Sequence, residues 1–104
     1  MEILLIEPSR VGRKMMGQML EQRGDVVHPF ALGGEALDHL RKHPEIEVII
    51  TSVEIQGICG LELCWEARVL SNSRNPLYIV VMSSNWERRK AIEALDSGAD
   101  DFIQ

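Results

Sequence analysis

The amino-acid sequence contains only two cysteines and has little clustering of basic residues. Cys59 and Cys64 have neither the CxxC spacing nor the histidine partners of a zinc site, so we expect reduced thiols. The 16 acidic and 11 basic residues give a net charge of −5, and the cations are scattered except for the short run 88–90. Because recognition of nucleic-acid phosphates needs a dense basic face, this composition argues against nucleic-acid binding.

Long apolar runs are also missing. No stretch approaches the roughly 20 apolar residues that span a bilayer. The first apolar run begins next to the N-terminal residue, without the basic segment of a secretion signal. We therefore expect a cytoplasmic protein that makes no contact with the membrane.

Motifs of common nucleotide-binding and hydrolytic enzymes are absent. The glycines at 33–34 and 57–60 match neither G-x-G-x-x-G nor the P-loop pattern, and they are predicted to lie in turns. His28, His39 and His43 are too scattered in the sequence to predict a ligand cluster, and no Ser-His-Asp arrangement fits the chain. We therefore expect a protein that is not an enzyme.

Length and composition indicate a single packed domain, since the chain has 104 residues, 45% of them hydrophobic and 26% charged. Strands are expected at 2–6, 25–30, 48–50, 77–82 and 102–103, with helices following Ser9 and at 35–43, 61–70 and 87–97. Strict alternation with short connections predicts an α/β fold with a doubly wound, five-stranded parallel sheet. Pro29 places the second strand at a sheet edge, and the longest apolar run, 77–82, predicts the centre.

In parallel sheets of this kind, functional residues lie in the loops that follow the carboxyl ends of the strands. Those ends are predicted to be Glu7, Ser52 and Ser83. We therefore expect the functional site at these three residues and the loops that carry them.

Three segments of the sequence resemble the receiver domain of bacterial response regulators. They are the opening I-L-L-I-E-P-S, the middle V-I-I-T-S-V-E-I-Q-G-I-C-G-L-E-L, and the closing I-V-V-M-S-S with A-L-D-S-G-A-D-D-F-I. The resemblance covers nearly the whole chain and implies a flavodoxin-like fold with strand order 2-1-3-4-5. It also implies two-component or phosphorelay signalling by one domain, 1–104, that is the N-terminal fragment of a longer protein with a linked output domain.

The resemblance also implies a fifth helix, which is missing from this chain. That helix would cover one sheet face beside the first helix. Without it, apolar side chains of the fourth and fifth strands are expected to be exposed. A second copy of the chain or another partner would cover them.

The resemblance places a phosphate-accepting pocket at the strand ends, and two of its acidic positions are altered. The family ends its first strand with an acidic pair that helps to hold magnesium, and this chain has Glu7 and Pro8 there. The family's phosphoacceptor aspartate corresponds to Ser52, which cannot form an acyl phosphate. Since phosphotransfer needs a carboxylate beside a charge-neutralising metal, we expect a degenerate receiver with no metal, no other cofactor and no phosphorylation.

Three further positions follow from the same resemblance. Glu54 is a remnant of the acidic pocket, where the family supplies a backbone carbonyl to the metal. Ser83 corresponds to the switch hydroxyl, with a loop or helix-capping serine as the alternative. Phe102 corresponds to the aromatic switch position, with simple core packing as the alternative.

Our first hypothesis is a regulatory module that acts by contact with a protein partner or with a second copy of the chain. In the family that this chain resembles, the face formed by the fourth helix and fifth strand commonly contacts partners. The candidate contact residues on this face are therefore Trp86, Arg88, Arg89 and Asp101. One alternative is a phosphoaccepting receiver that uses a shifted carboxylate such as Glu54. The other is a flavodoxin-like binder of a small ligand, which fold alone supports.

Overall fold

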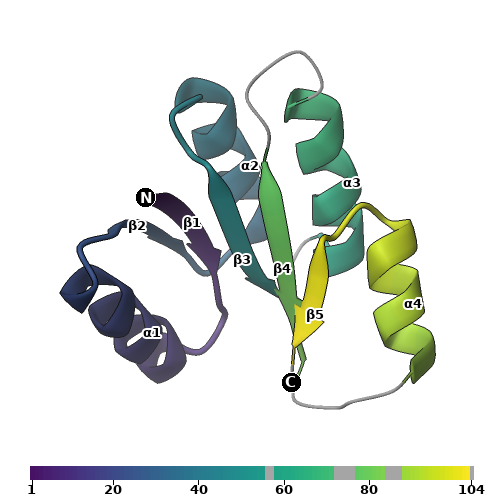
Figure 1. The fold of residues 1–104 in the computed structure, drawn as a ribbon, viewed down its shortest axis with the longest axis horizontal. Coiled ribbons are helices and arrows are strands. Elements are labelled where there is room, and N and C mark those ends of the chain that lie inside the picture. Colours follow the sequence, from purple (N-terminus) through teal and green to yellow (C-terminus); the bar gives the residue numbers. More distant parts are fainter. Residues whose placement is uncertain (56–57, 72–76, 84–87, 104) are drawn as a thin grey trace.

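Strands and helices alternate along the chain in the computed structural model, which describes residues 1–55, 58–71, 77–83 and 88–103 (Figure 1). The elements are β1 (Glu2–Ile6), α1 (Arg10–Gln22), β2 (Val26–Phe30), α2 (Gly33–Lys42), β3 (Val48–Ser52), α3 (Gly60–Ser71), β4 (Tyr78–Met82), α4 (Arg88–Asp96) and β5 (Asp101–Ile103). Within these described ranges, no helix combines the length and apolarity needed to cross a membrane.

All neighbouring strands pair in parallel, in the order β2-β1-β3-β4-β5. This order confirms the predicted fold class, and it confirms that β2, which contains Pro29, lies at an edge. The prediction that the run 77–82 forms the centre was wrong, because β3 is the central strand. A continuous apolar run is typical of strands in a parallel sheet, and β1 has one as well. Such a run therefore does not indicate where a strand lies in the strand order.

The main core lies between one face of the sheet and the helices α2, α3 and α4. Leu4, Ile49 and Ile79, which are neighbours across β1, β3 and β4, point into it and are almost fully buried. The helices contribute mainly small and branched side chains, including Ala67 of α3 and Ala94 of α4. Because residues alternate along a strand, the next residues face the opposite side of the sheet.

On that opposite side the described residues include only one helix, α1, which packs against β1 and β2. Ser9 caps α1 as predicted, since its hydroxyl accepts the Gly12 N–H at 3.1 Å. The apolar stripe of α1 is not buried throughout, because Met15 and Met19 are exposed, as are Tyr78 of β4 and Ile103 of β5 on the same side. The expected exposure of apolar side chains on β4 and β5 is therefore confirmed.

The apolar positions of α4 point differently from the pattern in the sequence. Ala91 and Ala94 are buried, whereas Ile92 and Leu95 have exposed fractions of 51% and 49%. Alanine lets a helix approach a sheet closely, so the two alanines face the sheet and the larger side chains point outward.

The prediction that the glycines at 33–34 form a turn was wrong, because both lie in the first turn of α2. A Cβ on Gly33 would lie 2.3 Å from the Ile58 side chain, so the requirement there is for close packing. Gly60 begins α3 for a similar reason, since a Cβ would lie 2.4 Å from the Ser52 carbonyl oxygen. Gly57 lies outside the described residues.

Candidate functional site

The loops after β1, β3 and β4 meet around a pocket of about 260 Å³ at the carboxyl edge of the sheet. Its lining includes five residues that the sequence singled out, together with two methionines: Glu7, Pro8, Met16, Ser52, Glu54, Met82 and Ser83. The structure thus brings together side chains from three separate segments of the chain, as parallel strands ending at one edge require.

A hydrogen bond joins the two strand ends at the centre of this pocket. The Ser52 hydroxyl donates to Glu7 Oε1 at 2.9 Å, and the Ser9 N–H donates to Glu7 Oε2 at 3.1 Å. The Arg13 guanidinium donates to the Glu7 backbone carbonyl at 2.8 Å and so holds the loop. Ser52 is buried, with an exposed fraction of 9%, and both carboxylate oxygens of Glu7 already accept a hydrogen bond from the protein.

The remaining pocket residues supply little further coordinating chemistry. Pro8 is exposed and has no side-chain oxygen. The Glu54 side chain is 59% exposed, and its Oε1 lies 3.9 Å from Lys90 Nζ of α4. Lys90 was not among the residues expected at the pocket, because nothing local in the sequence places α4 beside this loop. Among the described residues, no three or more His, Cys, Asp and Glu side chains are grouped to hold a metal ion.

The two switch-equivalent residues are both buried. Ser83 has an exposed fraction of 5%, and its backbone N–H donates to the Ile103 carbonyl at 3.0 Å, which ties the end of β4 to β5. Phe102 belongs to the core between the sheet and the helices. Ser83 lines the pocket and Phe102 does not, so of the pair only the hydroxyl is brought to the candidate site.

The structure describes the side chains of two of the four candidate contact residues. Arg89 of α4 is strongly exposed and lies 3.8 Å from Glu93, and Asp101 is exposed, with its carboxylate accepting the Phe102 N–H at 2.8 Å. Trp86 lies outside the described residues, and although α4 begins at Arg88, the side chain of that residue is not described.

Both cysteines are free, as expected: Cys59 is exposed and Cys64 is buried. Burial raises the pKa of the Cys64 thiol to about 11, which keeps it protonated. Neither cysteine lines the pocket that contains Glu7 and Ser52.

A five-stranded parallel sheet in the order 2-1-3-4-5, with a pocket at the carboxyl ends of its strands, defines the flavodoxin-like class of α/β folds. Within that class, the family model of the response regulator receiver domain matches residues 3–104. The chain therefore belongs to the receiver domain family of two-component signalling.

Two curated relatives are similar over almost the whole chain. The response regulator RppA of a Synechocystis strain is 31% identical over 104 residues, which cover 99% of this chain and 43% of RppA. The response regulator MprA of Mycobacterium avium is 28% identical over 103 residues, which cover 99% of this chain and 43% of MprA. The chain thus spans less than half the length of these relatives.

Solved structures share the fold at lower identity. The receiver domain of yeast Ssk1, crystallised with the phosphotransfer protein Ypd1 of Saccharomyces cerevisiae, superimposes with a TM-score of 0.90 at 18% identity, covering 100% of this chain and 78% of that one. The chemotaxis protein CheY4 of Vibrio cholerae gives 0.87 at 24% identity, covering 97% and 82%. Similarity at this level of identity establishes the fold alone.

Proposed function

We propose that this chain is a receiver module that passes its signal by protein contact and does not accept a phosphoryl group. The observation that carries the proposal is the hydrogen bond from Ser52 to Glu7, 2.9 Å long, at the position that corresponds to the family's phosphoacceptor. A neutral hydroxyl and one carboxylate satisfy each other there, where phosphotransfer would need a free carboxylate nucleophile.

The chemistry of the two side chains supports this proposal. A carboxylate attacks phosphorus as an anion, whereas the Ser52 hydroxyl would first have to lose its proton. Glu7 is the group to which that proton points, and a carboxylate is a weak base for an alcohol. The pocket therefore favours a resting hydrogen bond over a nucleophile.

The residues present do not fit magnesium, which other members of the family hold at this site. Magnesium requires nearly octahedral coordination by oxygen atoms at short distances. Pro8 offers no side-chain oxygen, the Ser52 proton points at Glu7, and the exposed Glu54 carboxylate lies near the Lys90 ammonium. Without the charge neutralisation that a metal supplies, transfer of a phosphoryl dianion is disfavoured.

We propose that contacts are made through α4 and β5, with a protein partner or a second copy of the chain. Ile92, Leu95 and Arg89 present exposed apolar and cationic surface on α4, a composition typical of interface centres. A protein partner is compatible with this fold, since the Ssk1 receiver domain was crystallised with the protein Ypd1. A covalently linked output domain is a further candidate, since the curated relatives are more than twice as long.

The proposal is tested by incubating the chain with acetyl phosphate and magnesium and measuring its intact mass. The mass of the unmodified chain should not change. A matched variant, Pro8→Asp with Ser52→Asp, restores two carboxylates beside Glu7 and should bind magnesium in a calorimetric titration in which the unmodified chain gives no heat. A phosphoryl adduct on the unmodified chain that disappears in Ser52→Ala would contradict the proposal.

The alternative with Glu54 as acceptor is separated by the same experiment. It requires an adduct that persists in Ser52→Ala and is lost in Glu54→Gln. The other alternative, a binder of a small ligand, rested on the fold alone, and membership of the receiver family makes a signalling role the better supported of the two.

Self-association through α4 is measured by sedimentation of the chain over a range of concentrations. A dimer that forms through this face should be weakened by Leu95→Asp and retained in Val69→Asp, an equally exposed apolar position on α3. A monomer at every concentration would exclude a second copy as the partner.

A further inference from the structure

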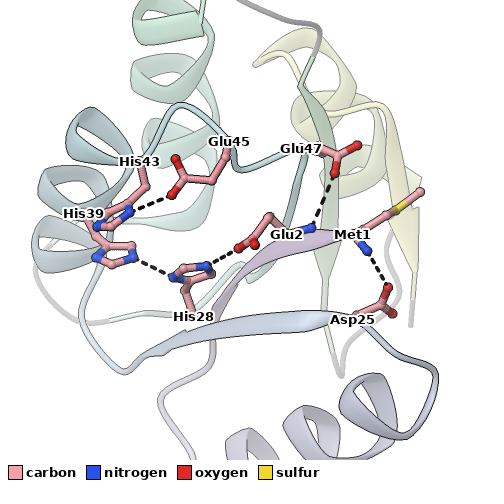
Figure 2. Close-up of polar contacts among 8 residues, drawn as sticks. All are labelled: Met1, Glu2, Asp25, His28, His39, His43, Glu45 and Glu47. Atoms are coloured by element: carbon pink, nitrogen blue, oxygen red, sulfur yellow. Dashed lines mark hydrogen bonds and ion pairs between the residues drawn. The ribbon is translucent and has the colours of Figure 1, made fainter.

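All three histidines of the chain meet at one place between β2 and α2, with His28 on the strand and His39 and His43 at the end of the helix (Figure 2). His28 Nδ1 lies 2.7 Å from His39 Nε2, and His28 Nε2 lies 2.6 Å from the Glu2 carboxylate of β1. The His39 and His43 rings, one helical turn apart, are stacked with centroids 3.9 Å apart. Packing of β2 against α2 therefore brings His28 into contact with the two histidines at the end of that helix, although separation along the sequence did not indicate this contact.

Two carboxylates close this histidine cluster, which consists of His28, His39, His43, Glu2 and Glu45. Glu45, in the connection from α2 to β3, lies 2.7 Å from His43 Nδ1. The cluster thus joins β1, β2, the end of α2 and the following connection through three polar contacts and the stacked His39 and His43 rings. The cluster does not form a metal site, because no group of His, Cys, Asp and Glu side chains among the described residues is placed to hold a metal ion.

The hydrogen bond between His28 and His39 restricts how many protons the cluster can hold. A contact of 2.7 Å between two ring nitrogens needs one proton between them, with one nitrogen donating and the other accepting. An ionised Glu2 accepts a hydrogen bond from the His28 Nε2–H group. His28 is then either neutral and accepts from His39, or doubly protonated and donates to it.

In both arrangements one of the two rings stays neutral. If both rings carried a positive charge, two N–H groups would face each other across 2.7 Å and the bond would break. His43 adds to this restriction, because a charged His43 ring would lie stacked against a charged His39 ring at 3.9 Å. Full protonation of the cluster is therefore incompatible with its present geometry.

We propose that the histidine cluster is a pH-sensitive contact that holds α2 against β2 in neutral solution and loosens it in mild acid. The ligand of this site is the proton. The inference does not depend on the proposed absence of phosphorylation, since no residue of the cluster lines the pocket that contains Glu7 and Ser52.

On balance, the surroundings of His39 lower its pKa. Burial lowers the pKa of His39 below its ordinary value of 6.5, and the neighbouring rings of His43 and His28 and the Lys42 ammonium lower it further, while the Glu45 carboxylate raises it. A histidine whose pKa is lower in the folded state binds more protons when unfolded. The stability it contributes is complete above about pH 6.5 and is lost as the pH falls through the folded-state pKa.

Loosening of α2 would be felt at the loop that borders the candidate site. The first turn of α2 packs closely on that loop, because a Cβ on Gly33 would lie 2.3 Å from the Ile58 side chain and 3.0 Å from that of Ile55. These two residues follow Glu54 and precede α3. A shift of α2 would therefore disturb the connection between β3 and α3.

The test is the urea-unfolding midpoint of the chain between about pH 7.5 and pH 5.5, measured with a chelator present. Loss of one partly buried hydrogen bond should raise the unfolding equilibrium constant roughly tenfold on acidification. The variant His39→Gln can still donate a side-chain N–H to His28 but cannot become charged. This variant should lose much less stability over this pH range than the unmodified chain. The control is Glu35→Gln, at an exposed residue in the first turn of α2, which should lose as much stability as the unmodified chain.

A second measurement needs no variant. In NMR titrations of the unmodified chain, the ring signals of His28 and His39 should shift in coupled steps, together with the backbone amides of α2 and of residues 55 and 58. A pH-independent midpoint would overturn the proposal, as would equal acid sensitivity in His39→Gln or ring signals that titrate without any change in α2.

Discussion

Arg68 of α3 connects three parts of the fold that no local pattern links. Its Nε donates to the Gly98 carbonyl at 2.7 Å, one terminal nitrogen donates to the Leu77 carbonyl, and the other pairs with the Asp100 carboxylate. Asp100 in turn accepts the Ile79 N–H at 2.8 Å. The side chain thus ties α3 to the start of β4 and to the turn between α4 and β5.

The variant Arg68→Met keeps most of the aliphatic stem, which packs on Gly98, and removes all three donors. A hydrogen bond from a charged donor is worth about 1.5–3 kcal/mol when buried. Because the Arg68 side chain is 30% exposed, water can replace part of each bond, and we take about 1 kcal/mol for each. The expected loss is therefore about 3 kcal/mol, a large part of the roughly 5–15 kcal/mol that stabilises a domain.

Urea denaturation followed by circular dichroism measures this loss. For an m-value of about 1.5 kcal/mol per M, the midpoint should fall by about 2 M. The matched control is Arg89→Met on α4. The Arg89 side chain is 83% exposed and makes a loose ion pair with Glu93 at 3.8 Å, so its loss should change the free energy of unfolding by less than about 0.5 kcal/mol. If Arg68→Met were no more destabilising than Arg89→Met, the connecting role of Arg68 would be refuted.

Three further outcomes are expected from other parts of the chain. At about pH 8, iodoacetamide should alkylate the exposed Cys59 and leave Cys64 unmodified in the folded chain, because burial raises the pKa of Cys64 to about 11, and mass spectrometry showing equal labelling would contradict this. Gly60→Ala should lower the urea midpoint strongly, since its Cβ would lie 2.4 Å from the Ser52 carbonyl oxygen, and an unchanged midpoint would show that the loop yields without cost. Ser9→Ala should cost about 1 kcal/mol through loss of the α1 cap, whereas Ser9→Asp should retain most of the stability in the same denaturation assay.

Much of the fold could be predicted from local patterns. The apolar run of β1, the Ser9 cap of α1 and Pro29 in an edge strand each correspond to a backbone requirement that a few neighbouring residues express. The positions of the strand ends follow from the same alternation, which places Glu7 and Ser52 at one edge of the sheet.

Other features depended on which face of an element meets the rest of the molecule. Ile92 and Leu95 are the large apolar residues of α4, but the buried positions are Ala91 and Ala94. The pattern of apolar residues on a helix does not say which small side chains permit the closest approach to the sheet. The distance between α4 and the sheet decides that, and it is a property of the packed structure.

By itself, the sequence determined the α/β class, the receiver family and the chemical identity of the candidate pocket, because these depend on local order and residue type. Only the tertiary structure decided that the Ser52 hydroxyl donates to Glu7, that Lys90 approaches Glu54, and that His28 meets the two histidines at the end of α2. Hydrogen bonds and ion pairs act over a few ångströms in space. Their partners are therefore set by how strands and helices pack, and not by separation along the chain.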